Sequence, residues 1–528
     1  MNKIHLLDCT LRDGGYCNQW EFGYDNIKRI VQSLADAEIE IIECGFLTNR
    51  IAYQRDVTKY TTMEEASKII PADRKNKLYV VMINYGEYEI ENLPDYDENS
   101  VDGIRVAFHK QDIEQALILC QKIQKKGYKV FVQPMVSLNY TDEEFLSLIQ
   151  LVNHIKPYAF YIVDSFGMMN KKNLIRLFYL VEHNLDESIW IGFHSHNNKQ
   201  LAYSNAQCLI DTQTARNLII DSSIFGMGRG AGNLNTELIV EYLNDNFSRQ
   251  YAINPLLHII DEVINGFYLQ NYWGYSLPNY LSASHSVHPN YARYLADKNT
   301  LTVEAMDEIF SMMSSEKGAE FDKDYIEELY FKFMSAGEVQ MLHMNDLKSC
   351  IEGKKVMLIA PGKSSEIEKE KIIELSKQDD IISVSVNYDY KYIDSGYIFI
   401  SNLRRFRELD KKLYYKCITT SNIPVNDVYL RTRYYDLLIR RETIKDNAGM
   451  MAIKFFLLLG AKEILLAGYD GYSYDSDENY ASKEMALIMK NAMVDAMNSE
   501  MKATLDEFSK KVKIRFVTQI KHINLISE

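Results

Sequence analysis

The chain has 528 residues, of which 47% are hydrophobic and 25% are charged, so it is long enough for two or three domains with buried cores. Its formal net charge of −14 excludes a general binder of nucleic acids or anionic membranes, because such proteins need a basic face. No apolar run reaches the ~20 residues that span a bilayer, no secretion signal is evident, and the seven scattered cysteines contain no C-x-x-C pair. We therefore expect a cytoplasmic protein with reduced thiols and without structural zinc.

Eight short runs of β-branched and apolar residues alternate with helical spacing over residues 1–236. Alternation of this kind predicts parallel βα units, and eight units predict a (β/α)8 TIM barrel. The runs cover residues 4–7, 39–44, 78–83, 104–108, 130–134, 160–164, 190–194 and 219–224. Active sites of such barrels lie at the carboxyl ends of the strands. The residues that follow each run are therefore the first candidates for a functional site.

Polar side chains follow six of the eight runs. These candidates are Arg12 and Asp13 after the first run, Glu43 at the end of the second, His109 after the fourth, Asp164 and Ser165 after the sixth, His194 and His196 after the seventh, and Asn233 in the glycine-rich turn after the eighth.

Three of these residues predict a metal site. His194 and His196 lie two residues apart, and the period of a strand points both imidazoles into the barrel mouth. Barrel closure places the first strand next to the eighth, so Asp13 can bring a carboxylate to the same ion from a loop that we expect to face solvent. Two histidines and one carboxylate leave coordination positions open for a substrate. An isolated H-x-H pair is also typical of two structural histidines, and it is the other polar strand ends that favour the metal site.

The remainder of the chain predicts two further parts. Residues 237–350 have a mostly helical pattern with a turn-rich, aromatic stretch at 271–294, and we expect a helical extension that covers the barrel mouth. A new βα series then begins, with predicted strands at 356–360, 381–386, 397–400 and 464–467. It predicts a Rossmann-like α/β domain over residues 351–528. The fold class is therefore α/β throughout.

Four motifs carry a resemblance to a known family. They are LDCTLRDGG at 7–15, VDSFG at 163–167, FHSHNN at 193–198 and GMGRGAGN at 226–233. Over about residues 3–300 the chain resembles the pyruvate-dependent 4-hydroxy-2-oxoacid aldolases, within the wider superfamily of hydroxymethylglutaryl-coenzyme A lyase and isopropylmalate synthase. The resemblance implies that Asp13, His194 and His196 bind Mn²⁺ or Mg²⁺ and that Arg12 stabilises an enolate oxygen. Asn233 is either a further metal ligand or a turn asparagine that bonds its own backbone.

The implied activity is a metal-dependent aldolase that forms or cleaves a carbon–carbon bond between pyruvate enolate and an aldehyde, in sugar or surface-polysaccharide metabolism. Its partners are then a small 2-oxo acid and an aldehyde, and a homo-oligomer is compatible with the sequence. Two alternatives stay open. One is a Claisen-type acyltransferase that uses an acyl-coenzyme A and a 2-oxo acid, and the other is a barrel that serves only as a scaffold.

The general base is the least settled part of this assignment. Bacterial aldolases of the family carry a histidine three residues after the metal-binding aspartate, whereas this chain has Tyr16. A tyrosine with an ordinary pKa near ~10 is a poor base at neutral pH. The candidates for the base are Tyr16, His109, Tyr275, His285 and His288. For the remaining polar strand ends, we expect Glu43 to hold Arg12 or a metal-bound water, and Asp164 and Ser165 to orient ligands or pack the mouth.

The C-terminal part opens with LIAPGKSS at 358–365, a strand followed by a tight turn. Backbone amides at Gly362, Lys363 and Ser364 can hold a phosphate, although the spacing is not that of a Walker A loop. Residues 447–472 read as a buried helix, a glycine stop and a strand, which is weakly similar to the Rossmann-like domains of bacterial sialyltransferases. We expect this domain to hold an activated sugar or a phosphorylated compound related to the substrate of the barrel. The alternative is a structural or oligomerisation domain.

Overall fold

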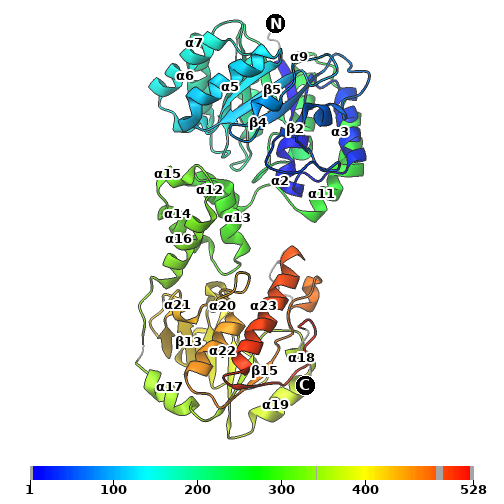
Figure 1. The fold of residues 1–528 in the computed structure, drawn as a ribbon. Coiled ribbons are helices and arrows are strands. Elements are labelled where there is room, and N and C mark those ends of the chain that lie inside the picture. Colours follow the sequence, from blue (N-terminus) through cyan, green and yellow to red (C-terminus); the bar gives the residue numbers. More distant parts are fainter. Residues whose placement is uncertain (1–3, 213, 341, 483–490, 524–528) are drawn as a thin grey trace. The chain divides into compact units, whose positions relative to one another are not determined.

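The structure is a computed structural model that describes residues 4–212, 214–340, 342–482 and 491–523. The chain divides into two compact units (Figure 1), one formed by Met1–Ala292 with Ser314–Phe321 and the other by Arg293–Met313 with Asp322–Glu528. The segment 237–350, for which the sequence predicts a helical extension, is thus shared between them. Within the described residues, no helix is both long and apolar enough to cross a membrane.

The first unit contains the predicted barrel of eight parallel strands. β1 pairs with β9 on one side and with β2 on the other, which closes the ring. The order around it is β1-β9-β8-β7-β6-β5-β4-β2, and the short β3 (Lys59–Tyr60) pairs with the end of β2. The eight strands are β1 (Ile4–Asp8), β2 (Ile41–Leu47), β4 (Leu78–Asn84), β5 (Gly103–Phe108), β6 (Lys129–Pro134), β7 (Ala159–Asp164), β8 (Trp190–Ser195) and β9 (Leu218–Ser222).

Helices cover the outside of the barrel, and α5, α6 and α7 lie side by side there (Figure 1). In α3 (Tyr24–Asp36) the buried residues Ile27, Ile30, Val31 and Leu34 follow a three-to-four spacing, so one face packs on the strands and the other meets solvent. The further helices of the ring are α4 (Met63–Ser67), α5 (Ile113–Lys125), α6 (Asp142–Ile155), α7 (Lys171–Asn184), α8 (Ala202–Ile210), α9 (Thr236–Phe247), α10 (Ile253–Ile259) and α11 (Asn265–Gln270).

The barrel interior holds both an apolar and a charged set of side chains. One interior cluster includes Leu7, Ile41, Val80, Phe131 and Ile219. A second interior group consists of charged side chains that are almost completely buried: Glu43, Arg105 and Asp221. Arg105 donates from Nη1 to Glu43 Oε2 at 2.7 Å and from Nη2 to Asp221. Buried charges are tolerated when they are paired in this way, and these three support the side chains of the barrel mouth.

A strap from the helical region returns to the barrel. It comprises α12 (Leu277–Ser284), the first residues of α13 (Pro289–Asp297) and α15 (Ser315–Gly318). The backbone N–H of His288 donates to Gly318 O at 2.8 Å, and Tyr291 Oη donates to Lys317 O and Glu320 O at 2.8 and 2.6 Å. These bonds tie the segment Ser314–Phe321 to the residues around His288.

The second unit is built on a seven-stranded parallel sheet, which confirms the predicted C-terminal α/β domain. The strand order is β14-β13-β12-β11-β10-β15-β16. β11 to β14 thus extend the sheet on one side of β10, and β15 and β16 extend it on the other side. The strands are β10 (Lys355–Ile359), β11 (Ile381–Val386), β12 (Tyr397–Ile400), β13 (Cys417–Thr420), β14 (Leu430–Thr432), β15 (Glu463–Ala467) and β16 (Lys513–Phe516). The sequence does not predict β13, β14 and β16, each of which has only three or four residues.

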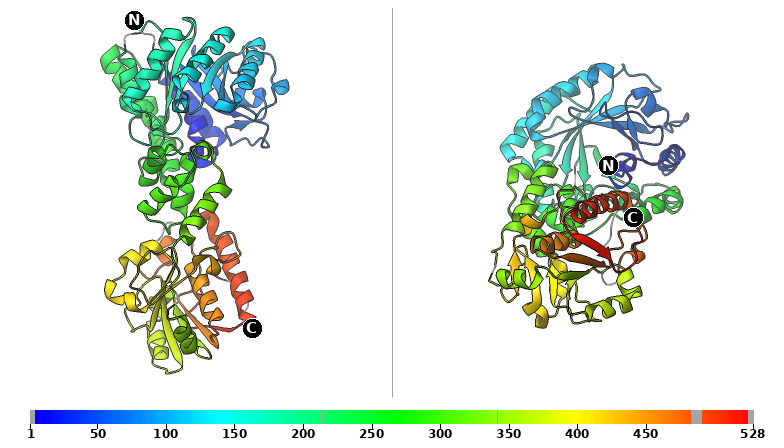
Figure 2. Two further views of the ribbon diagram at one scale, coloured as in Figure 1. Left: turned by 90° about the vertical axis from the view of Figure 1, so that its left-hand side faces the viewer. Right: turned by 60° about the horizontal axis from the view of Figure 1, so that its bottom comes forward.

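Helices pack against this sheet. α22 (Ala448–Leu458) contacts β10 and β11, and α23 (Asn491–Ser509), the red helix of Figure 2, contacts α22 and β16. The other helices of the unit are α14 (Val303–Ser311), α16 (Lys323–Ser335), α17 (Met344–Ile351), α18 (Ser364–Ile367), α19 (Lys369–Ser376), α20 (Leu403–Glu408) and α21 (Tyr434–Leu437).

Candidate metal centre

Three ligand-type side chains converge at the carboxyl end of the barrel. Asp13 ends the short helix α1 (Thr10–Asp13) that follows β1, His194 lies in β8, and His196 follows it. One potential ligand atom of each lies within 4.8 Å of those of the other two. All three side chains are buried. The arrangement is what a divalent ion with open coordination positions requires.

His194 is oriented by a carboxylate on the neighbouring strand. Its Nδ1 lies 3.0 Å from Asp221 Oδ2, and Asp221 is itself held by Arg105 and by Tyr161 Oη at 3.1 Å. A hydrogen bond at Nδ1 fixes the tautomer that presents Nε2 as a ligand. The fully buried Arg105 thereby acts on the site through Asp221.

His196 is suited to act as a neutral ligand. Burial lowers its pKa to about 3, although the nearby Asp13 opposes the shift. Its Nδ1 lies 3.7 Å from Asp13 Oδ2 and has no hydrogen-bond partner among the described residues. A buried polar atom without a partner is costly unless something else satisfies it, and a metal ion would do so.

Asp13 is prepared as an ionised ligand. Burial would raise its pKa, but the positive charge of the neighbouring Arg12 holds the pKa well below its usual value. Its Oδ1 accepts from Arg12 Nη1 at 2.6 Å, and its Oδ2 accepts from Asn233 Nδ2 at 2.8 Å. The prediction that Asp13 lies on a solvent-facing loop is wrong: α1 folds back into the barrel mouth and leaves the residue only 1% exposed.

Asn233 and Arg12 contribute two more buried atoms without partners. Asn233 Oδ1 makes no hydrogen bond with described residues, although Nδ2 of the same amide bonds Asp13. Arg12 donates from Nε to Glu43 Oε2 at 3.0 Å and from Nη1 to Asp13, whereas its Nη2 has no hydrogen-bond partner in the described part of the chain. Oδ1 is thus an oxygen with metal-ligand character, and Nη2 is a fixed cationic donor for a substrate oxygen. Together with Nδ1 of His196, these atoms show that the residues present fit a bound ion and a ligand.

A small cavity of about 130 Å³ lies at the barrel mouth within the first unit. Arg229 reaches it from the glycine-rich turn, with its Nη1 3.1 Å from His288 Nε2 and its Nη2 donating to Ser165 O at 3.0 Å. Its backbone N–H donates to Asp13 Oδ2 at 3.3 Å, which connects the cavity to the three ligand residues. His109 also lines the cavity, and its Nε2 lies 3.2 Å from a carboxylate oxygen of Glu320.

The structure separates the candidates for the general base. Burial raises the pKa of Tyr16, whose ring lies under the Arg229 guanidinium, so its hydroxyl stays protonated at neutral pH. His109 and His288 line the cavity, and burial lowers the pKa of both, so both are neutral. Tyr275 and His285 are not among the residues that line it, and Tyr275 is 57% exposed.

The side chains of Asp164 and Ser165 accept hydrogen bonds from backbone N–H groups of the protein. The Asp164 carboxylate accepts from the backbone N–H groups of Met168 and Met169 at 3.0 Å, and burial raises its pKa to about 6. Ser165 Oγ accepts from the N–H of Val136 at 2.9 Å, while its backbone carbonyl faces Arg229. Both residues therefore shape the mouth through backbone contacts.

In the turn at residues 362–364, groups that the sequence offers for a phosphate are bonded to other side chains of the protein. Both the N–H and the Oγ of Ser364 bond the carboxylate of Asp470, and Lys363 Nζ lies 2.5 Å from Glu478 Oε1. Asp470 thus occupies the acceptor position that a phosphate would take at Ser364. Gly362 lines a large pocket of the second unit. The similarity of this part to sialyltransferases stays a prediction.

Three residues of the site were missed from sequence. Arg105 and Asp221 lie inside strands that are otherwise largely apolar, and a charge within such a run is the signal that could have revealed them. Arg229 lies in the GMGRGAGN motif, whose glycine pattern gives no signal for the role of its side chain.

The chain is similar to known proteins over its N-terminal part. Residues 105–260 match the HMGL-like family. A 4-hydroxy-2-oxovalerate aldolase from Geobacillus genomosp. 3 is 27% identical over 271 residues, which are 48% of this chain and 78% of that aldolase. An oxaloacetate decarboxylase from Mycobacterium tuberculosis is 26% identical over 239 residues, which are 45% of this chain and 69% of that enzyme. The crystal structure of the N-terminal domain of a candidate aldolase from Bacteroides vulgatus is 28% identical with a TM-score of 0.46, and the match covers 55% of this chain and 95% of that domain.

The sequence similarity to these relatives spans about half of the chain. It confirms the prediction that this protein is an enzyme, a lyase similar to HMGL-like enzymes.

Proposed function

We propose that the barrel is a divalent-metal-dependent aldolase that cleaves or forms 4-hydroxy-2-oxo acids from pyruvate and an aldehyde. The observation that carries the proposal is the convergence of Asp13, His194 and His196 beside the unpartnered Nη2 of Arg12. A Mn²⁺ or Mg²⁺ ion held by these three residues, with Asn233 Oδ1 as a further ligand, would bind the 2-oxo acid and disperse the negative charge of the pyruvate enolate.

Arg12 supplies a second, permanent positive charge for the enolate oxygen. Its guanidinium is fixed by Glu43 and Asp13, so Nη2 has little freedom and needs no rearrangement when charge develops on the substrate. Preorganised donors of this kind are worth about 10²–10³ in rate. The rigid fork is the reason for an arginine rather than a lysine at this position.

We assign removal of the 4-hydroxyl proton to His109. His109 Nε2 lies 3.2 Å from a carboxylate oxygen of Glu320, so a proton on Nε2 would leave Nδ1 as the acceptor, whereas His288 Nε2 faces the donor Arg229. After His109 takes the proton, the bond between C3 and C4 breaks, its electron pair passes to the enolate of pyruvate, and the aldehyde is released. Protonation at C3 then gives pyruvate. We do not assign this role to Tyr16, because burial raises its pKa and a protonated hydroxyl is a poor base at neutral pH.

The test is to incubate the full chain and Mn²⁺ with a panel of 4-hydroxy-2-oxo acids, including those derived from sugar aldehydes, and to measure pyruvate with lactate dehydrogenase. We expect pyruvate release that a chelator abolishes and Mn²⁺ restores. Asp8→Asn is the matched control for substitution of a ligand residue, because Asp8 is a buried carboxylate near the site whose hydrogen bonds with described residues are to Thr10 and Thr236. If no substrate yields metal-dependent pyruvate and no aldehyde adds to pyruvate, the proposal is wrong.

The similarity to an oxaloacetate decarboxylase favours one second candidate, decarboxylation of a 2-oxo diacid. This reaction passes through the same pyruvate enolate but needs no base for a hydroxyl proton. Oxaloacetate therefore belongs in the panel, and activity on it that is unchanged in His109→Gln would identify the decarboxylase. Release of free thiol from acetyl-coenzyme A in the presence of a 2-oxo acid would instead identify the Claisen-type acyltransferase.

A further inference from the structure

The second unit contains a cavity of about 820 Å³, whose lining comes entirely from that unit. It lies where β10, β11, β12 and β15 end, and it also borders the start of α22. The strand order reverses between β10 and β15, so the cavity lies at a topological switch point of a parallel sheet. Ligands of such sheets bind outside the carboxyl ends of the strands at this point. The volume is in the range of pockets that bury a small organic molecule.

The two central loops approach each other too closely for side chains. A Cβ at Gly362, after β10, would meet Gly468 O at 2.2 Å, and one at Gly468, after β15, would meet Ala360 O at 2.1 Å. Gly468 also has φ +73°, a conformation that favours glycine. At this point the two loops contact each other through backbone atoms, and neither glycine projects a side chain.

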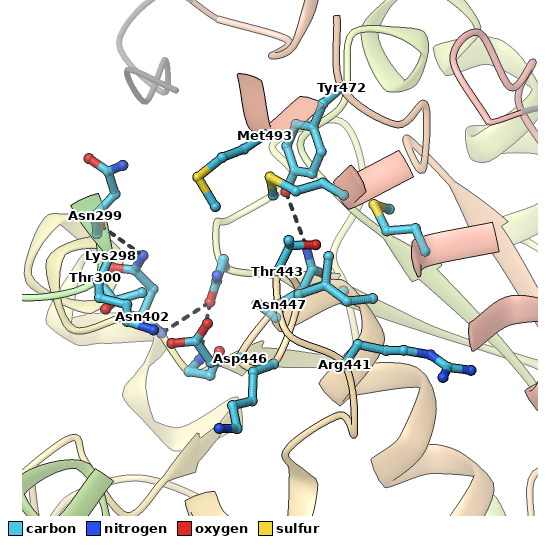
Figure 3. A pocket seen from close by; sticks show the side chains of 18 of the residues that line it. Lys298, Asn299, Thr300, Asn402, Arg441, Thr443, Asp446, Asn447, Tyr472 and Met493 are labelled. Atoms are coloured by element: carbon cyan, nitrogen blue, oxygen red, sulfur yellow. Dashed lines mark hydrogen bonds between the residues drawn. The ribbon is translucent and has the colours of Figure 1, made fainter. Parts of the chain in front are cut away.

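One part of the lining is aromatic and thioether-rich. Figure 3 shows Tyr472 and Met493 on one side of the pocket and Lys298 and Asn299 on another. Tyr469, Tyr480, Met497 and Met501 also belong to this part of the lining. Flat aromatic rings and polarizable thioethers are suited to the face of a planar ring.

A second part of the lining is suited to an anion. In α22, Asn447 Oδ1 accepts from the N–H of Met450 at 3.1 Å, and among described residues the N–H groups of Ala448 and Gly449 make no hydrogen bond. Arg440, also in the lining, forms no ion pair within the described part of the chain. A further arginine of the lining, Arg405, is buried to 8% exposure. Unpaired amides at a helix start and guanidinium groups together favour a phosphate.

We propose that this cavity binds a nucleoside phosphate, with the base against the tyrosine and methionine side chains and the phosphate at the start of α22. The site differs from the turn at Ser364, whose N–H is bonded to Asp470. It does not depend on the reaction that the barrel catalyses.

The first experiment is calorimetric titration of the full chain with the monophosphates of cytidine, uridine, adenosine and guanosine. The full chain is needed because several residues within 294–300 and 323–327 also line the cavity. The corresponding nucleosides and inorganic phosphate are titrated as controls. We expect at least one nucleotide to bind at least about tenfold more tightly than both its nucleoside and phosphate alone, since each half of the ligand has its own part of the lining. Failure of every nucleotide to bind below about millimolar concentration, or equal affinity for inorganic phosphate, would overturn the proposal.

The second experiment places a charge where we expect the phosphate. Ala448→Glu adds a carboxylate at the first position of α22, which a helix tolerates well, and Ala448→Gln is the uncharged control of nearly equal size. We expect the glutamate variant to bind the nucleotide at least about tenfold more weakly and the glutamine variant to stay within about threefold of the wild type. Thermal unfolding of both variants checks that the fold is unchanged.

A second pair of variants keeps the test independent of α22. Arg440→Gln removes an exposed arginine from the lining, whereas Arg433→Gln removes an exposed arginine of the same segment that does not line the cavity. We expect weaker nucleotide binding only for Arg440→Gln. Wild-type affinity in both Ala448→Glu and Arg440→Gln would show that the phosphate does not bind here.

Discussion

Replacing Asp13 with asparagine tests the metal site most directly, because the substitution keeps the size of the side chain and removes its charge. The neutral amide is a poorer ligand. Loss of a hydrogen-bond partner behind a metal ligand typically costs 10–100-fold in affinity or activity, so loss of charge on the ligand itself should cost more than about 100-fold in Mn²⁺ affinity. Turnover should fall by at least the same factor at limiting metal.

The same substitution should also lower stability. The carboxylate accepts from Arg12 Nη1 on one oxygen, and from Asn233 Nδ2 and the backbone N–H of Arg229 on the other. An asparagine presents an oxygen to only one of these two sides, so at least one buried donor loses its acceptor, at a cost of about 1–3 kcal/mol. Arg12 keeps its bond to Glu43, which limits the loss. We expect a folded protein whose free energy of unfolding is lower by that amount.

The assay combines Mn²⁺ titration by calorimetry, urea unfolding of the metal-free protein, and pyruvate release. Asp8→Asn should show a similar loss of stability with Mn²⁺ affinity close to that of the wild type, since Asp8 bonds Thr10 and Thr236 instead of a ligand residue. An Asp13→Asn protein that binds Mn²⁺ with wild-type affinity and turns over normally would refute the metal assignment.

Three further substitutions test the groups around the ligands. Asp221→Asn should lower Mn²⁺ affinity by about 10–100-fold, because it disturbs the tautomer and orientation of His194, and titration of the metal-free protein measures this; an unchanged affinity would contradict the orienting role. Arg12→Lys should reduce kcat by about 10²–10³ while Mn²⁺ affinity changes less, because a lysine cannot bond Glu43 and the substrate with one rigid fork. A kcat near the wild-type value would contradict the role of Arg12 in enolate stabilisation. Burial lowers the pKa of His109 below its usual value near 6.5, so kcat/KM should be constant at neutral pH and fall only as the pH drops through that lowered pKa, where the base becomes protonated. This acid limb should disappear in His109→Gln together with most of the activity, and an unaltered pH profile would show that another group is the base.

The C-terminal turn shows how a correct local pattern can lead to the wrong contact. The sequence correctly predicts a strand that ends before Gly362, and turns of this kind often bind phosphate. The acceptor that faces Ser364 is Asp470, more than one hundred positions further along the chain at the end of β15. Because β15 pairs beside β10, the protein supplies its own carboxylate there. Only the pairing of these strands reveals this.

The sequence by itself determined the barrel, the carboxyl-end location of its site and the three candidate ligands. It could do so because strands buried on both faces leave continuous apolar runs and because His194, His196 and Asp13 are fixed by their positions relative to strand ends. The tertiary structure decided which groups hold them. Arg105 and Asp221 are 116 positions apart and meet only after the ring closes, and His109 meets Glu320 only because the strap returns to the barrel. Such contacts depend on closure, register and long connections, which local periodicity does not encode.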